Sequence, residues 1–86
     1  MAAYEVLFAR SARKELEDIE VRFAVQILKK IEELSINPRP TGSKKLKGEN
    51  DLWRLRVGNY RVIYSISDSD KLIDVSVIRH RKDVYK

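Results

Sequence analysis

The chain places three arginines where they could hold a phosphate group. Arg54, Arg56 and Arg61 lie in residues 53–64, where a Gly-Asn pair separates two runs of alternating polar and apolar side chains. A Gly-Asn pair between two alternating runs predicts a β-hairpin with a two-residue turn. The turn pairs Arg56 with Arg61 on the outer face, where like charges repel unless an anion lies between them. Because a guanidinium donates two parallel hydrogen bonds to phosphate, the hairpin predicts a phosphodiester-binding site.

The opposite face of this predicted hairpin is apolar and is expected to lie in the core. Its members are Trp53, Leu55, Val57, Tyr60, Val62 and Tyr64. Successive side chains of a strand point to opposite faces of the sheet, so these six residues do not share a surface with the arginines. The aromatic residues among them are therefore interpreted as core residues and not as a stacking surface for bases.

Other cations and two proton-transfer groups extend the candidate site. The cations are Lys44, Lys45 and Lys47 before the hairpin, and Arg79, Arg81 and Lys82 after it. His80 and Tyr85 could move protons, since histidine titrates near ~6.5 and tyrosine near ~10 unless cations lower its pKa. An arginine stays protonated and cannot act as a base. The alternative interpretation is a solvated basic face, with an exposed histidine that has no task and a tyrosine that packs the C-terminal end.

Hydrophobic periodicity predicts the elements that precede the hairpin. Alternation over residues 4–8 indicates a short first strand. Ser11 is expected to cap a helix over residues 12–17, and Asp18 to cap an amphipathic helix over residues 19–34. These helices are expected to cover one face of the sheet.

The second half of the chain is predicted to supply the rest of the sheet. Asn37-Pro38 ends the long helix, and residues 43–51 are interpreted as an exposed loop. A turn at residues 67–70 leads into a last strand. The core face of this strand is predicted to carry Ile73, Val75 and Val77, and its outer face Leu72, Asp74, Ser76, Ile78 and His80. This register would put Ser76 beside Arg61 and Asp74 near Arg54.

The order of these elements predicts an α+β fold in a single domain, residues 1–86. In it, two N-terminal helices pack on one face of a twisted, mainly antiparallel, four-stranded sheet. Residues 1–37 carry six basic and seven acidic side chains, and residues 38–86 carry twelve basic and six acidic ones. The excess positive charge thus belongs to the half that contains the arginines, which favours a polyanionic partner.

Composition excludes several other classes of function. The chain has no cysteine and one histidine, so we expect no disulfide, no thiol nucleophile, no metal site and no cofactor. Its three glycines form no nucleotide-binding pattern. We find no apolar run that could cross a bilayer and no secretory leader, which predicts a cytoplasmic protein without a membrane partner.

Four segments together resemble the RelE/ParE superfamily of toxins from prokaryotic toxin-antitoxin systems. They are residues 46–48, 53–57, 59–64 and 78–85. The resemblance implies the RelE-like fold, which agrees with the α+β arrangement predicted above. In the RelE branch, the toxin enters the ribosomal A site and cleaves mRNA without a metal, by attack of a ribose 2′-hydroxyl on the adjacent phosphate. Translation is thereby inhibited and growth arrested.

The resemblance also implies roles for individual residues. Arg54, Arg56, Arg61 and Arg81 would bind phosphate and stabilise the transition state, and Tyr85 would act as a base or stack on an mRNA base. Lys44, Lys45, Lys47, His80 and Lys82 would extend the RNA-binding surface. The best-known members have lysines where this chain has Arg54 and Arg56, which argues against a general-base role at these two positions.

Two other functions remain open at this stage. The ParE branch shares the fold but inhibits DNA gyrase, generally without these catalytic residues. A plain RNA-binding module would use the basic face without toxicity. For a toxin of either branch, the resemblance implies a cognate antitoxin that neutralises the basic groove in a hetero-oligomer, and for the RelE branch it adds the ribosome and mRNA as partners.

Overall fold

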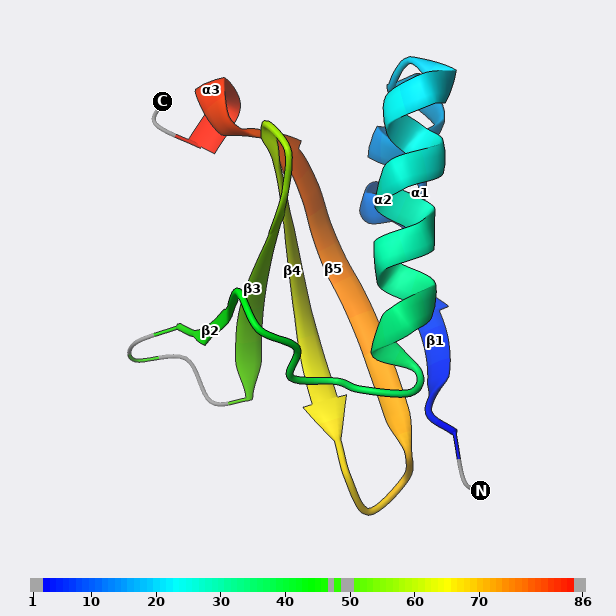
Figure 1. Cartoon of the computed structure of the whole chain (residues 1–86), viewed down its shortest axis with the longest axis vertical. Helices are drawn as coiled ribbons and strands as arrows, with labels where there is room; N and C mark the ends of the chain where they lie inside the picture. Colours follow the sequence, from blue (N-terminus) through cyan, green and yellow to red (C-terminus); the bar gives the residue numbers. More distant parts are fainter. Residues whose placement is uncertain (1–2, 47, 49–50, 85–86) are drawn as a thin grey trace.

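The computed structural model describes residues 3–46, 48 and 51–84 of the 86-residue chain. Along the chain the elements are β1 (Glu5–Phe8), α1 (Arg10–Asp18), α2 (Val21–Leu34), β2 (Ser43–Lys45), β3 (Leu52–Val57), β4 (Tyr60–Ser67), β5 (Leu72–His80) and α3 (Arg81–Val84). The strands form one sheet in the order β1-β5-β4-β3-β2, in which only β1 and β5 of the described strands run parallel (Figure 1). The predicted α+β fold with a mainly antiparallel sheet is confirmed.

The sheet has five strands in the described part of the chain, one more than predicted. The additional strand is β2, which lies in the segment expected to be a loop. It pairs antiparallel with β3, so that Lys44 lies opposite Arg54 and Lys45 opposite Trp53. A three-residue edge strand with two lysines has little hydrophobic pattern of its own, and pairing with β3 determines its conformation.

The two long helices, α1 and α2, lie on the same side of the sheet (Figure 1). Ile27, Ile31 and Leu34 of α2 are buried at helical spacing against the core. The predicted caps are wrong: the N-cap residues are Ala9 and Glu20, and neither makes a side-chain cap hydrogen bond. No helix within the described residues is long and apolar enough to span a membrane.

The first helix starts earlier than predicted because the backbone is anchored just before it. The Ala9 N–H donates to the Val75 carbonyl at 2.8 Å, which extends the contact between β1 and β5 up to the first helical turn. The helix therefore begins at Arg10. At its other end the Ile19 N–H bonds the Leu16 carbonyl and Ile19 is extended, so Asp18 is the last residue of α1 and not a cap of α2.

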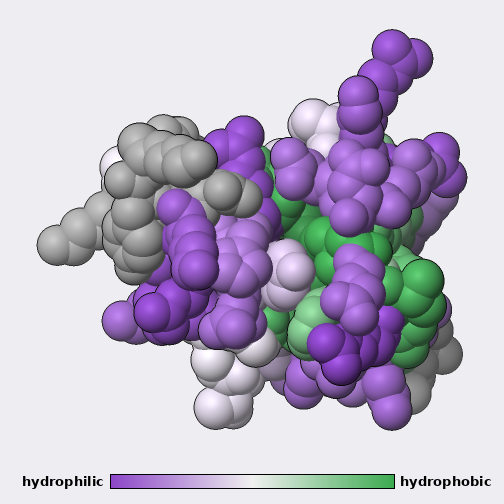
Figure 2. Space-filling model, turned by 90° about the horizontal axis from the view of Figure 1, so that it is seen from above, coloured by the Kyte–Doolittle hydropathy of each residue, from purple (hydrophilic) through white to green (hydrophobic). Residues whose placement is uncertain are grey.

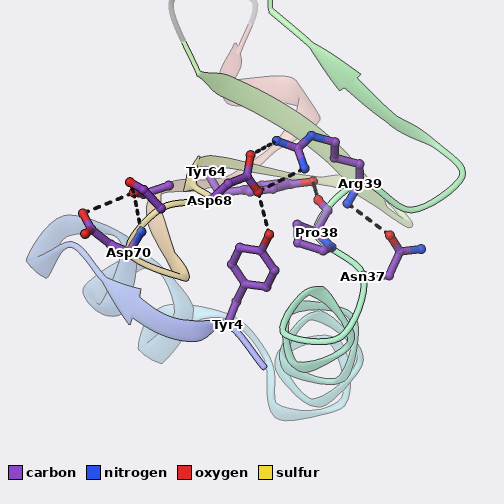
Figure 3. A network of polar contacts seen from close by, with 9 residues as sticks. Tyr4, Asn37, Pro38, Arg39, Tyr64, Asp68 and Asp70 are labelled. Atoms are coloured by element: carbon purple, nitrogen blue, oxygen red, sulfur yellow. Dashed lines mark hydrogen bonds and ion pairs between the residues drawn. The ribbon is translucent and has the colours of Figure 1, made fainter. Parts of the chain in front are cut away.

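A network of polar contacts fastens the connection between α2 and β2 to the sheet (Figure 3). The Tyr64 hydroxyl, which is fully buried, donates to the Pro38 carbonyl at 2.7 Å. Burial raises the pKa of this hydroxyl. Nearby, Asp68 accepts hydrogen bonds from Arg39 Nη2 at 2.9 Å and from the Tyr4 hydroxyl at 2.6 Å. The connection is thus held at two points, one buried and one exposed.

The register between β4 and β5 differs from the predicted one. Ser67 pairs with Leu72, so the turn is residues 68–71 and not 67–70, and the two strands are offset by two residues from the predicted pairing. A bulge then interrupts the ladder between Ile63 and Tyr64. Tyr64 pairs with Val75 and Ile63 with Val77, which leaves Ser76 as the additional residue. Such a bulge exchanges the faces of all residues beyond it, because side chains alternate along a strand. The predicted faces of Val77, Ile78 and His80 are therefore wrong: Ile78 is fully buried in the core.

Candidate nucleic-acid interface

The β3–β4 hairpin has the register that its two-residue turn predicts. Val57 pairs with Tyr60 and Arg56 with Arg61. Gly58 has a φ of 58°, the left-handed value that two-residue hairpin turns require of their first central residue. This short turn fixes the pairing of every residue in the two strands that it joins. Arg56 and Arg61 thus lie opposite each other on the sheet face that does not carry the core residues.

A third arginine continues this pair onto the next strand. Arg79 pairs with Arg61 across β4 and β5, and Arg61 pairs with Arg56 across β3 and β4. We refer to Arg56, Arg61 and Arg79 as the arginine row. The sequence-based register placed Ser76 beside Arg61, which is wrong because the strands are already offset by two residues at their turn and the bulge adds a third. Arg79 was noted only as a nearby cation, and Asp74, expected near Arg54, pairs with Ser65 instead.

A second cationic pair lies on the same face, farther from the hairpin turn. Lys44 of β2 pairs with Arg54 of β3, and Arg54 pairs with Ile63 of β4. Lys45 points to the other face, because it pairs with the core-facing Trp53. Of these two lysines, Lys44 shares the face of the arginines and Lys45 lies on the other face.

Arg81 reaches the site from the first position of α3. Its backbone N–H donates to the Asn59 carbonyl at 2.7 Å, which ties the start of α3 to the hairpin turn. A surface hollow of about 200 Å³ lies at this junction. It is lined by Arg56, Gly58, Asn59, Tyr60, Arg61 and Arg81. We refer to it as the arginine hollow, because arginines from three different elements line it.

Among residues 3–46, 48 and 51–82, no carboxylate forms an ion pair with the exposed arginines of this face. The ion pairs found there join Arg22 to Glu20, Lys30 to Glu33 and Arg39 to Asp68. Arg56, Arg79 and Arg81 are all exposed, and none of them takes part in these pairs. The face therefore carries a concentrated positive charge, and a nearby anion would be attracted to it.

Arg39, in contrast, is an arginine that forms an ion pair with a carboxylate. Its guanidinium binds Asp68, and this contact raises the pKa of Arg39. The same contact, together with the Tyr4 hydroxyl, lowers the pKa of Asp68. The charge of Arg39 is thus compensated by Asp68, in contrast to the charges of the exposed arginines.

His80 lies on the other face of the sheet from the arginine row. It pairs with Tyr60, and the two rings meet edge to face with centroids 5.1 Å apart. Its Nδ1 accepts a hydrogen bond from the Lys82 N–H at 3.2 Å. A hollow of about 140 Å³ lies beside these rings and is also lined by Phe23 and Val57. Figure 2, which looks down on this end of the molecule, shows apolar surface between hydrophilic residues.

The remaining predicted site residues are placed as follows. Lys82 is exposed on α3. Lys47 and Tyr85 lie outside the described residues. Among the described residues, no three His, Asp or Glu side chains form a group that could hold a metal ion.

The sequence model of one protein family matches residues 6–85. The family is described as ParE toxin of type II toxin-antitoxin system, parDE. Among curated relatives, toxin RelE3 of Methanocaldococcus jannaschii is 35% identical over 85 residues, which cover 94% of each chain. The chain belongs to the RelE/ParE superfamily of toxins. It is a toxin of a type II toxin-antitoxin system.

Solved structures of RelE toxins have the same fold. The archaeal RelE-RelB complex from Pyrococcus horikoshii matches with a TM-score of 0.82 and 31% identity, over 94% of this chain and 97% of that chain. The intact E. coli RelBE toxin-antitoxin complex matches with a TM-score of 0.81 and 26% identity, over 91% and 96% of the two chains. This chain therefore has the fold of the solved RelE toxins.

Proposed function

We propose that this toxin is a ribosome-dependent endoribonuclease that cleaves mRNA in the ribosomal A site. The observation that supports this function is the convergence of Arg56, Arg61 and Arg81 on one surface hollow. Guanidinium groups bind a phosphodiester through paired hydrogen bonds, and they stabilise the additional negative charge of a pentacoordinate transition state. Arg79 and Arg54 extend this cationic face on both sides of the hollow.

The proposed reaction uses the ribose next to the scissile phosphate as its nucleophile. The 2′-hydroxyl loses its proton to a base while its oxygen forms a bond to phosphorus. The bond from phosphorus to the 5′-oxygen breaks, and this oxygen takes up a proton. The products are a 2′,3′-cyclic phosphate and a 5′-hydroxyl end. The arginines bind the non-bridging oxygens throughout, because they can hold charge but cannot accept a proton.

The base is assigned to Tyr85, by resemblance to the RelE branch. His80 is less well placed for this role, because it lies on the opposite sheet face. Its Nδ1 already accepts the Lys82 N–H, so the neutral ring carries its proton on Nε2. His80 would therefore have to give up that hydrogen bond before accepting a proton at Nδ1. Tyr85 has no such hydrogen bond to give up in the mechanism that the RelE resemblance implies.

Dependence on the ribosome follows from the shape of the site. The arginine hollow has a volume of about 200 Å³ and lies open at the surface, so it can hold a phosphate without fixing the whole nucleotide. In-line attack needs the 2′-oxygen, the phosphorus and the leaving oxygen to be aligned, and alignment contributes a large part of rate acceleration. The ribosomal A site supplies this alignment by holding the mRNA in a defined conformation.

A cognate antitoxin is the proposed regulatory partner. The P. horikoshii and E. coli relatives described above are complexes of a RelE toxin with its antitoxin. In this chain an antitoxin would cover the arginine face with an acidic segment and prevent RNA binding. Release of the antitoxin would then lead to mRNA cleavage, inhibition of translation and growth arrest.

Inhibition of DNA gyrase is the alternative, because the matching family model is described by the name ParE. This function requires protein binding without RNA chemistry. The curated relative named above is a RelE toxin, and a hollow lined by three arginines fits RNA cleavage better. A supercoiling assay with purified gyrase separates the two functions, since a nuclease leaves gyrase active.

Toeprinting on translating ribosomes tests the proposed nuclease. We expect the wild type to cut mRNA in the A site and an Arg61→Ala/Arg81→Ala variant to lose activity. Removal of one preorganised donor typically costs about 100- to 1,000-fold in rate. An Arg10→Ala/Arg13→Ala variant removes the same charge from α1 and should cut normally. Absence of cutting by the wild type, or undiminished cutting by the Arg61/Arg81 variant, would reject the proposal.

A further inference from the structure

A second cationic hollow lies beside the arginine row, between the hairpin and α2. It has a volume of about 290 Å³ and is lined by Gln26, Lys29, Lys30, Arg56, Val57 and Gly58. Arg56 and Gly58 also line the arginine hollow. The two hollows are therefore neighbours around the end of the hairpin. The cationic surface does not end at the sheet but continues onto α2.

The three polar residues that α2 contributes to this hollow come from one face of the helix. Gln26, Lys29 and Lys30 are spaced by three and four residues, so they lie on the same side of the helix, and all three are exposed. Lys30 is 3.8 Å from Glu33, an exposed and weak ion pair that a stronger anionic ligand can replace. Lys29 makes no ion pair with a carboxylate among the described residues. Both ammonium groups are thus available to an anion.

We infer that Lys29 and Lys30 bind the sugar-phosphate backbone of the RNA strand where it continues past the arginine row and around the end of the hairpin. The inference rests on the proposed function, since it assigns a second stretch of the same RNA to this toxin. One polyanion passing both hollows would meet Arg56 in the middle, because Arg56 lines both of them.

An acidic protein segment is the competing ligand for this surface. Protein interfaces usually bury an apolar centre surrounded by polar residues. The surface that lines this hollow is more apolar than polar, so its composition fits either ligand. The charges favour RNA, because Lys29, Lys30 and Arg56 continue the cationic lining of the arginine hollow and neither lining contains an acidic residue. A chain of phosphates that follows both hollows would meet positive charge along its whole path.

Salt-dependent RNA binding tests this inference without the ribosome. The variant is Lys29→Gln/Lys30→Gln, and the matched control is Arg13→Gln/Lys14→Gln, which removes the same charge from exposed positions of α1. The probe is a short single-stranded RNA with 2′-O-methyl riboses, which cannot be cleaved by 2′-hydroxyl attack. Fluorescence anisotropy gives the dissociation constant of each protein at a series of NaCl concentrations.

The expected result is a smaller salt dependence for the Lys29/Lys30 variant. Each phosphate contact in a single strand contributes about 0.7 to the slope of log affinity against log salt, so two contacts contribute about 1.4. Over a fourfold rise in salt, the wild type should then lose about 7-fold more affinity than this variant. The control should keep the slope of the wild type.

Other outcomes would overturn the inference and identify its replacement. Equal slopes for the wild type and the Lys29/Lys30 variant mean that no phosphate contacts these lysines. If the variant keeps its RNA affinity but binds the cognate antitoxin more weakly, the surface belongs to an acidic protein segment. Failure of the proposed function gives a different pattern. In that case toeprinting finds no cleavage by the wild type, whereas the slopes of the two proteins still differ in the binding assay.

Discussion

The arginine row should make the fold less stable than it would be without these charges. Arg56 and Arg79 each have one like-charged cross-strand neighbour, Arg61. A like-charge pair directly opposite on a sheet is destabilising, and cross-strand pairs typically contribute about 0.2–1 kcal/mol. Replacing Arg56 by threonine, which favours strands, removes one such pair. We therefore expect Arg56→Thr to stabilise the free toxin by about 0.5 kcal/mol at low salt.

Thermal denaturation of the purified toxin measures this effect. For a domain of this size, 1 kcal/mol corresponds to about 4–8 °C in Tm, so Arg56→Thr should raise Tm by about 2–4 °C at low ionic strength. Arg79→Thr should give a similar increase, and the double variant about the sum of the two. The gain should nearly vanish in ~1 M salt, where the screening length falls to about 3 Å. Cleavage of mRNA should fall in both single variants.

Lys45→Thr is the matched control for this experiment. It removes the same charge from a strand, but Lys45 pairs with Trp53 and has no cation opposite it. Its Tm should change little and should not depend on salt in the same way. The reasoning would be refuted by a lower Tm of Arg56→Thr at low salt, or by a gain that is equally large in ~1 M salt. Either result would mean that the arginines do not repel one another in the folded protein.

Two further predictions concern the network around Asp68 and Pro38. Tyr64→Phe leaves the buried Pro38 carbonyl without the hydroxyl that donates to it at 2.7 Å, which should cost about 1–3 kcal/mol in urea denaturation. Tyr4→Phe, which removes an exposed hydrogen bond to Asp68, should cost less, and an equal loss would contradict this account. Arg39 lowers the pKa of Asp68 in the folded protein, so the carboxylate stabilises the fold above the unfolded pKa of about 3.9. The Tm difference between wild type and Asp68→Asn should therefore be constant near neutral pH. It should disappear as the pH falls through the lower folded-state pKa of Asp68. A difference that persists in acid would exclude this contact as its cause.

The hairpin could be predicted from the sequence because one short turn determines it. Two residues between alternating runs leave a single register, and Gly58 supplies the backbone conformation that the turn needs. The pairing of Arg56 with Arg61 follows directly. The long helix was predicted for a similar reason, since its apolar residues repeat at helical spacing over several turns.

The edge of the sheet could not be predicted in the same way. Ser43–Lys45 contains one serine and two lysines, a composition that is as common in loops as in edge strands. Its strand conformation depends on backbone hydrogen bonding to β3, and this partner is seen only in the folded chain. The predicted caps were wrong for a related reason, because the hydrogen bond from Ala9 to Val75 precedes α1 and is formed only when β5 is in place.

The composition of the arginine row depends on the bulge at Ser76, for a reason that packing explains. Without the additional residue, pairing of Tyr64 with Val75 would continue so that Arg61 met Ile78 and Tyr60 met Arg79. Ile78 would then lie on the open face, and Arg79 would point toward the core. The bulge avoids burying an unpaired charge, which costs far more than one interrupted ladder position. Val75, Val77 and Ile78 are all apolar, so either alternation of faces along the strand would place apolar side chains in the core. The sequence pattern therefore contains no sign of this exchange of faces. The same bulge brings Arg79 next to Arg61 and moves His80 to the opposite face, and it thereby separates the phosphate-binding arginines from the histidine.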